Sequence, residues 1–181
     1  PYPHRLFQGG KDLMQPEDNK ERLGFENYWR RDVSDIRDQV LSIWKDHGGP
    51  TGNDATARLN QIVWVVKNSG GSVVGLSTAY KVYIKQLRNH LFATRLLLVP
   101  QYRIPGLTSK LFVETRDFLE SIHSGDEQEQ AIGVITLVEN PRMKEYRNEA
   151  VWPASGMVYI GNSQEGHHIR VYYFKDARIA P

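Results

Sequence analysis

The residues best suited to chemistry lie in a short loop with the spacing R-x-x-G-x-T, formed by Arg103, Gly106 and Thr108. The loop follows an apolar run and directly precedes a segment with helical periodicity, all within LLLVPQYRIPGLTSKL at 96–111. A tight loop between a strand and a helix N-terminus directs backbone N–H groups toward one point, where they can bind phosphate. A glycine suits such a loop where φ is positive or where a phosphate approaches the backbone closely. The spacing therefore predicts a site for a phosphate-bearing cofactor.

Other reactive side chains do not form a recognisable set. The chain has no cysteine, which excludes disulfides, zinc bound by cysteine and thiol catalysis. His167 and His168 are adjacent in sequence, a spacing that favours a pair flanking a hairpin over a metal site. No metal is therefore expected.

Composition is that of an ordinary globular protein of 181 residues, of which 40% are hydrophobic and 24% charged. The formal net charge of +2 comes from scattered side chains, which argues against binding of nucleic acid. No apolar run is long enough to span a membrane. We expect a cytoplasmic protein with an irregular arm at 1–23, rich in proline and polar residues, and a single domain at 24–181.

The first part of the domain is predicted to form a strand followed by helices. An aromatic-rich strand is expected at 25–31. Apolar residues then recur at the 3.6-residue period, with Asp32 as the N-cap and the turn residues at 47–50 as the stop. The turn-rich stretch at 52–60 is predicted to hold one helical turn.

Three strands at 61–67, 72–85 and 91–99 are predicted to form an antiparallel meander, because turn residues separate them. An amphipathic helix at 107–123 leads to an apolar strand, and a helical crossover places that strand parallel to 91–99. The remaining elements are that strand at 131–138, a polar loop at 125–130, a short helix at 141–150 and strands at 157–161 and 169–174. The expected fold class is α/β of the mixed α+β kind, a mostly antiparallel sheet with a central parallel strand pair and helices on both faces.

This element order and the loop resemble the GCN5-related N-acetyltransferase (GNAT) superfamily over 25–174. Arg103 and Gly106 match the family's acetyl-CoA motif Q/R-x-x-G-x-G/A, and 99–102 is similar to the family's approach to that motif. A second similarity is Asn140 after the fifth strand, followed by a short helix and a Gly-hydrophobic pair at 156–157. The resemblance implies acetyl-CoA (coenzyme A) as the cofactor and transfer of its acetyl group to an amine of a small molecule or a protein.

The sequence departs from the family's pattern at two positions. Thr108 replaces a Gly or Ala, which adds bulk near the expected pyrophosphate but also a hydroxyl that can donate to it. The family often has a tyrosine in the helix after the fifth strand, at the place that Arg147 occupies here. Tyr146 is one residue away and is the candidate general acid, although one residue on a helix corresponds to a rotation of about 100°.

The resemblance implies that the cofactor lies between the strands at 91–99 and 131–138. The backbone of Leu97–Val99 is expected to pair with the pantetheine amides, and the N–H of Leu98 or Val99 to stabilise the oxyanion. Backbone N–H groups of 103–108 and the dipole of the following helix are expected to hold the pyrophosphate. The cofactor-binding candidates are Leu97, Leu98, Val99, Arg103, Ile104, Gly106, Leu107, Thr108 and Asn140.

Three residues are candidates for the general base, because acetyl transfer needs a neutral amine. They are Glu26 near the first strand, His90 at the start of the fourth and Glu139 after the fifth. Each also fits an ordinary surface position, and proton transfer through water, or no base at all, stays an alternative.

Arg95 is a charged residue within an apolar strand, which is costly unless it is paired. It could form a salt bridge, reach the sheet edge or line the acceptor pocket for an anionic substrate group. Tyr80 and Tyr83 on the preceding strand could help shape that pocket, or simply be strand aromatics.

These expectations combine into an acetyl-CoA-dependent N-acetyltransferase that acts by direct transfer, since no covalent nucleophile is evident. Two alternatives stay open: a GNAT-like domain that binds coenzyme A with little or no catalysis, and a transferase of longer acyl groups. A homodimer is a further open alternative.

Overall fold

The three-dimensional structure is a computed structural model that describes residues 22–123 and 130–179. The predicted arm at 1–23 and loop at 125–130 lie almost entirely outside the described residues. The strands are β1 (Gly24–Asn27), β2 (Ile62–Lys67), β3 (Val73–Ile84), β4 (Asn89–Leu98), β5 (Gly133–Val138), β6 (Val158–Asn162) and β7 (His168–Tyr173). The helices are α1 (Arg37–Asp46), α2 (Gly52–Leu59), α3 (Leu107–His123) and α4 (Pro141–Tyr146), with a 3-10 turn at Pro100–Tyr102.

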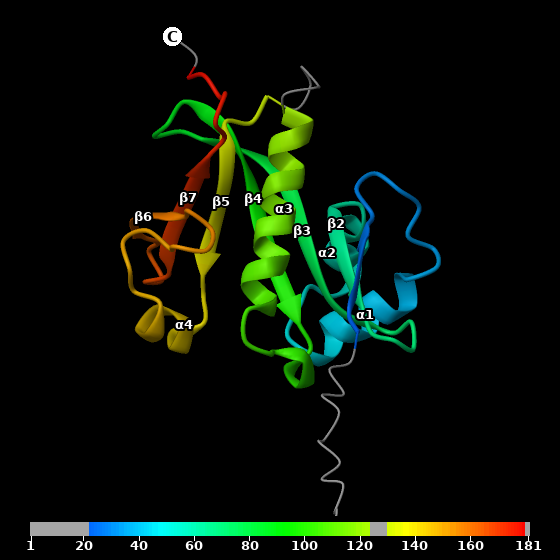
Figure 1. Cartoon of the computed structure of the whole chain (residues 1–181). Helices are drawn as coiled ribbons and strands as arrows, with labels where there is room; N and C mark the ends of the chain where they lie inside the picture. The colour runs from blue at the N-terminus through cyan, green and yellow to red at the C-terminus, as the bar shows by residue number, and fades with distance from the viewer. Residues whose placement is uncertain (1–21, 124–129, 180–181) are drawn as a thin grey trace, which may run out of the picture.

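The described strands form one seven-stranded sheet in the order β1-β2-β3-β4-β5-β7-β6, shown in Figure 1. Neighbouring strands are antiparallel except for β4 and β5, which are parallel. The predicted mixed sheet with one central parallel pair is therefore confirmed. The connection from β4 to β5 runs through α3, as a parallel crossover requires.

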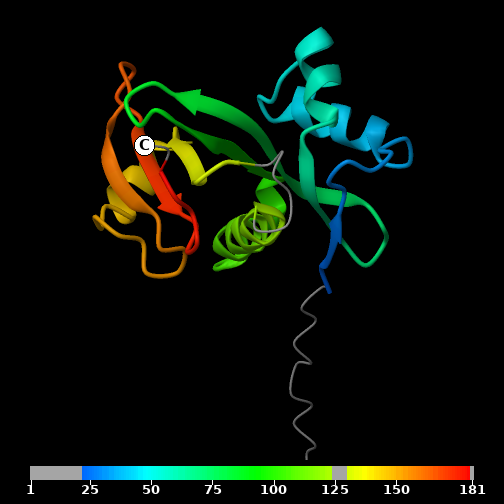
Figure 2. The same ribbon diagram turned by 90° about the horizontal axis from the view of Figure 1, so that it is seen from above.

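Helices cover both faces of the sheet, as Figure 2 shows. On one face α3 packs against the centre of the sheet, where Leu119 and Phe92 share a hydrophobic cluster. On the other face α1 and α2 pack over β2 and β3, where Val40 and Leu59 share a cluster with Ile62. Because side chains alternate along a strand, successive residues of β4 face opposite layers of the molecule.

Two helices near the start of the domain differ from their predicted extents. The Asp32 carboxylate accepts the N–H and the hydroxyl of Ser34, at 3.0 and 2.7 Å. It thereby closes a separate turn, and α1 begins only at Arg37. The segment predicted to hold one helical turn forms the eight residues of α2.

The helix after β5 is shorter than predicted and ends at Tyr146 instead of residue 150. Arg147 leaves the helical region with φ −129° and ψ 57°. The carbonyl oxygens of Arg147 and Glu149 accept hydrogen bonds from the Arg170 side chain on β7. Contacts with a strand far along the chain thus replace the next helical turn.

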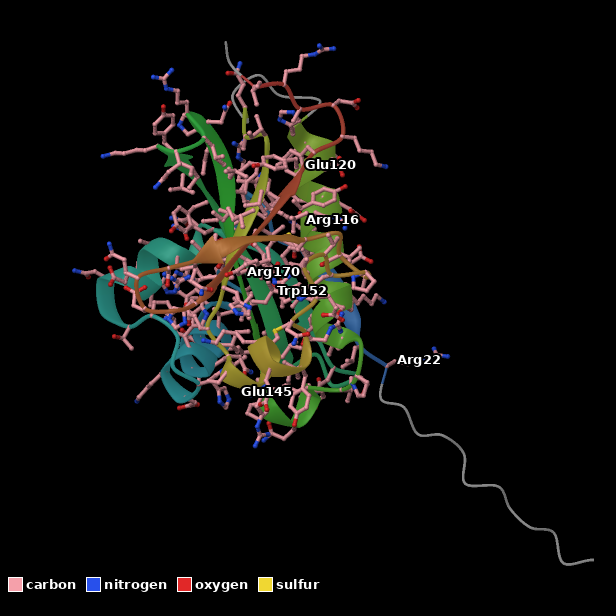
Figure 3. All side chains as sticks on the ribbon, turned by 90° about the vertical axis from the view of Figure 1, so that its left-hand side faces the viewer. Arg22, Arg116, Glu120, Glu145, Trp152 and Arg170 are labelled. Atoms are coloured by element: carbon pink, nitrogen blue, oxygen red, sulfur yellow. The ribbon has the colours of Figure 1, made fainter. Side chains whose placement is uncertain are left out.

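Arg170 anchors the segment after α4 to the sheet. It is only 1% exposed and donates to the carbonyl oxygens of Arg147 and Glu149 at 3.2 and 2.9 Å. Its guanidinium carbon lies 4.1 Å from the centroid of the Trp152 ring, and Figure 3 shows the two side chains together. Burial lowers the pKa of Arg170, and the Glu149 carboxylate partly offsets this effect.

Replacing Arg170 by methionine tests this anchor. Arg170→Met removes the buried guanidinium and leaves the Arg147 and Glu149 carbonyl groups without their donor, so we expect the free energy of unfolding to fall by about 3 kcal/mol. Urea denaturation measures the change. The matched control Arg178→Met alters an exposed arginine and is expected to stay within about 0.5 kcal/mol of the parent protein. An unchanged midpoint for Arg170→Met would contradict the anchoring role.

Candidate functional site

The parallel strands β4 and β5 separate soon after they pair. Their register covers only Phe92–Val134 and Ala93–Ile135, and Figure 1 shows the strands parting toward their C-terminal ends. Two threonine hydroxyls bridge the strands where they part. Thr94 Oγ1 lies 3.3 Å from the Ile135 carbonyl oxygen, and Thr136 Oγ1 lies 3.1 Å from that of Thr94. Beyond this point, the side of β4 that faces β5 has no strand paired with it.

The hydrogen-bond phase of β4 decides which of its backbone groups face the gap. The Val99 N–H donates to the carbonyl oxygen of Val74 on β3 at 2.9 Å. Bonded pairs alternate along an antiparallel ladder, so Leu97 also directs its N–H and C=O toward β3. Leu96 and Leu98 direct theirs toward β5, beyond the last paired residues. The backbone groups of Leu97 and Val99, which were expected to serve pantetheine and the oxyanion, are therefore directed toward β3, and those of Leu96 and Leu98 toward the gap.

Arg103 secures the end of β4 with its side chain. Its Nε donates to the Leu98 carbonyl oxygen at 3.1 Å. This bond closes the loop onto the strand and leaves the Leu98 N–H as the predicted oxyanion donor that faces the gap. The other guanidinium N–H groups of Arg103 form no hydrogen bond with a described residue.

The loop amides divide into those engaged within the loop and those left over. The N–H groups of Arg103, Ile104 and Leu107 donate to backbone carbonyls, and Pro105 has none. Within the described part of the chain, the N–H groups of Gly106, Thr108 and Ser109 have no partner. The N–H groups of Arg103, Ile104 and Leu107 are therefore not available as donors, although they belong to the expected set at 103–108. The N–H of Ser109 is available, although the motif did not indicate it.

Gly106 marks the turn from the loop into α3. Its φ is +84°, a conformation that glycine adopts without the cost that other residues incur. No other heavy atom lies within 4 Å of where its Cβ would be, so the backbone is open to a ligand. Leu107 and Leu111 are buried and fix the first turn of α3 on the sheet. Lys110 adds a positive charge beside the positive end of the helix dipole.

Asn140 and Tyr146 mark the two ends of α4. Asn140 Oδ1 accepts from the N–H groups of Arg142 and Met143, so this oxygen caps the helix and is not free for a cofactor. Tyr146 ends the helix, is 75% exposed, and its hydroxyl contacts no described residue through a hydrogen bond. Because β4 and β5 are parallel, α4 begins at the same end of the sheet as α3.

Two of the three candidate bases lie far from the gap. Glu26 is on β1, three strands from β4 and thus about 14 Å away, and it forms a 2.7 Å ion pair with Lys67. His90 is five residues before Arg95 in β4, about 17 Å along the strand, and its ring lies 5.1 Å from that of Tyr83. The structure therefore does not bring Glu26 or His90 to the gap between β4 and β5.

Glu139, the third candidate base, lies with Arg95 at the gap. Its Oε1 is 3.9 Å from an Arg95 nitrogen, and both side chains are more than half exposed, at 58% and 52%. Tyr80 pairs with Ala93 and shares the face of Arg95. Tyr83 shares the opposite face with His90, so the structure does not place it beside Arg95.

Metal and membrane features are lacking in the part of the chain that the structure describes. No group of three or more His, Asp or Glu side chains there could hold a metal ion. Across 22–123 and 130–179, no helix is both long and apolar enough to cross a bilayer.

Hydrogen exchange tests the assigned phase of β4. We expect the amides of Leu97 and Val99 to exchange at least tenfold more slowly than those of Leu96 and Leu98, because only the former are bonded within the sheet. Amide exchange followed by NMR on the free protein gives all four rates. Equal protection of the four amides would rule out the open edge.

Known structures share this architecture, although no family model and no curated protein matches the chain. A GNAT superfamily phosphinothricin acetyltransferase from Sinorhizobium meliloti, solved with AcCoA, has a TM-score of 0.63 at 13% identity, covering 88% of this chain and 92% of that one. A GNAT family N-acetyltransferase from Escherichia coli, solved with CoA, has a TM-score of 0.57 at 14% identity, covering 88% and 85%. An acetyltransferase of the GNAT family from Streptococcus pneumoniae gives 0.56 at 10% identity, covering 84% and 99%. The chain therefore has the GNAT fold.

Proposed function

We propose that this protein is an acetyl-CoA-dependent N-acetyltransferase. The observation that carries the proposal is the alignment of two sets of free donors at the same end of the sheet. One set is the backbone of Leu96 and Leu98 along the open edge of β4. The other is the three loop amides that begin at Gly106. Coenzyme A has pantetheine amides that suit a strand edge and a pyrophosphate that suits a helix N-terminus.

In this proposal the loop holds the pyrophosphate. The amides of Gly106, Thr108 and Ser109 donate to its oxygens, and Arg103 and Lys110 add positive charge. Pantetheine then runs from the loop along β4 and meets the Leu98 N–H before it reaches Leu96. The thioester carbonyl, at the far end of pantetheine, lies beside the Leu96 N–H, which stabilises the oxyanion of the tetrahedral intermediate.

The reaction transfers the acetyl group directly to an amine. The amine nitrogen attacks the thioester carbon, the new C–N bond forms and the C–S bond breaks. The amine proton passes to a base, and a proton is supplied to the departing thiolate. Glu139 is the candidate base at the gap, and Tyr146, near the same end of the sheet, is the candidate acid. The chain has no cysteine to carry the acetyl group as a thioester.

A second candidate function is binding of coenzyme A without efficient catalysis. The exposed Tyr146 favours it, because its hydroxyl is not oriented by any described residue. Turnover with a panel of amines, followed by release of free thiol, separates the two functions.

Cofactor binding tests the loop. Saturating acetyl-CoA is expected to raise the melting temperature by about 3 °C or more. Gly106→Glu should abolish this shift, because it places a carboxylate at the phosphate site. Gly48→Glu is the matched control, since Gly48 also has positive φ and open surroundings but follows α1 on the other face of the sheet. A full shift with Gly106→Glu would refute the loop as the phosphate site.

Removing the Tyr146 hydroxyl tests the acid. If Tyr146 protonates the thiolate, Tyr146→Phe is expected to lower kcat at least tenfold while acetyl-CoA still binds. Steady-state thiol release gives kcat, and thermal shift gives binding. Tyr83→Phe serves as the control, because Tyr83 pairs with His90 at the start of β4, which is the end of the strand away from the gap. Unchanged kcat for Tyr146→Phe would remove this residue from the mechanism.

A further inference from the structure

Arg95 is a charged side chain with unused hydrogen-bonding capacity in the middle of the sheet. It lies in β4, the fourth of the seven strands, between Thr94 and Leu96. A guanidinium has five N–H donors. Among the described residues, that of Arg95 makes no hydrogen bond and one ionic contact, with Glu139. The folded chain therefore leaves most of its donors for another group.

The contact between Arg95 and Glu139 is long and open. The closest nitrogen and oxygen are 3.9 Å apart, beyond hydrogen-bond distance, and both side chains are more than half exposed. An exposed pair with such geometry contributes little to stability. A cation and an anion held apart in this way present complementary charges to a small molecule that itself has both.

The two side chains share the face of the sheet where the strands part. Leu91 on β4 and Ile135 on β5 lie in one hydrophobic cluster, so these two side chains are on the same face of the sheet. Alternation then places Arg95 on the same face as Leu91, and Glu139 on the same face as Ile135. Leu96, whose N–H faces the gap, directly follows Arg95 in β4. The pair is therefore close to where the proposed function places the thioester.

Exposed apolar side chains surround the pair on this face. Leu137 is 41% exposed and precedes Glu139 by two residues, and Tyr80 is also 41% exposed and pairs with Ala93. Neither contributes a charge near neutral pH. An apolar portion of a substrate would find contact surface here beside the two charges.

From these observations we propose that the acceptor is a 2-amino acid or a close analogue, with an apolar side chain. This inference rests on the proposed function. The Arg95 guanidinium binds the carboxylate, and the Glu139 carboxylate binds the ammonium group and takes its proton. The neutral nitrogen then attacks the thioester carbon, and a C–N bond forms as the C–S bond breaks. The nitrogen loses its second proton, and the departing thiolate gains a proton to give the free thiol. Arg95 is unchanged in the reaction, and Tyr80 and Leu137 contact the apolar side chain.

Matched pairs of acceptors test the inference, because each pair differs only in the carboxylate. The pairs are L-phenylalanine with 2-phenylethylamine and L-leucine with isoamylamine. We expect kcat/KM for the amino acid to exceed that for the amine at least tenfold, mainly through KM. Arg95→Gln should remove this difference by acting on the amino acid alone. Arg22→Gln is the control, since Arg22 is exposed and precedes β1, which is three strands from β4.

The outcomes separate this inference from the proposed function. If acetyl-CoA produces no thermal shift, the proposed function fails, and this inference fails with it. If acetyl-CoA binds and the two members of each pair react equally, or Arg95→Gln slows both members equally, the inference alone is overturned. If no acceptor turns over, calorimetry with L-phenylalanine on the CoA-bound protein decides. If L-phenylalanine does not bind when it is present at millimolar concentration and in 10-fold molar excess over the protein, the inference is overturned.

Discussion

The structure depends on one constraint, the parallel pairing of β4 and β5 that stops after two residue pairs. A central strand that loses its neighbour keeps backbone N–H and C=O groups that must bond to something else. Two threonine hydroxyls, from Thr94 and Thr136, satisfy the first of these positions. Leu96 and Leu98 lie beyond them. Arg103 donates to the Leu98 carbonyl oxygen, and the Leu98 N–H and both backbone groups of Leu96 are available to water or to a ligand with amides of its own.

The surrounding elements keep this gap in place from both sides. The helix α3 packs across the centre of the sheet, and its first turn is fixed by buried Leu107 and Leu111. On the β5 side, Arg170 joins the segment after α4 to β7 through backbone carbonyls and the Trp152 ring. These contacts lie on elements next to the gap. A change in the packing of α3 or in the contacts of Arg170 is therefore expected to alter the separation of β4 and β5.

Much of the fold followed from the sequence, and the misjudged positions have physical causes. The helix at 107–123 and the parallel pair were predictable because apolar periodicity and a helical crossover are local signals. The start of α1 was not, because Asp32 bonds Ser34 in a turn that competes with a helix cap. Nor was the end of α4, because the Arg170 side chain binds the carbonyl oxygens of Arg147 and Glu149 in a segment that has left the helix. Those contacts join residues more than twenty positions apart.

The sequence by itself determined the strand, loop and helix around Gly106, and with them the prediction of a phosphate site. Those features depend on residue types within a dozen positions. Only the tertiary structure decided that the amides of Leu96 and Leu98, and not those of Leu97 and Val99, face the gap. It also decided that Arg95 meets Glu139 and that Glu26 and His90 lie elsewhere. The physical reason is that strand register and hydrogen-bond phase are fixed by pairing between distant segments, which residue spacing along one strand does not encode.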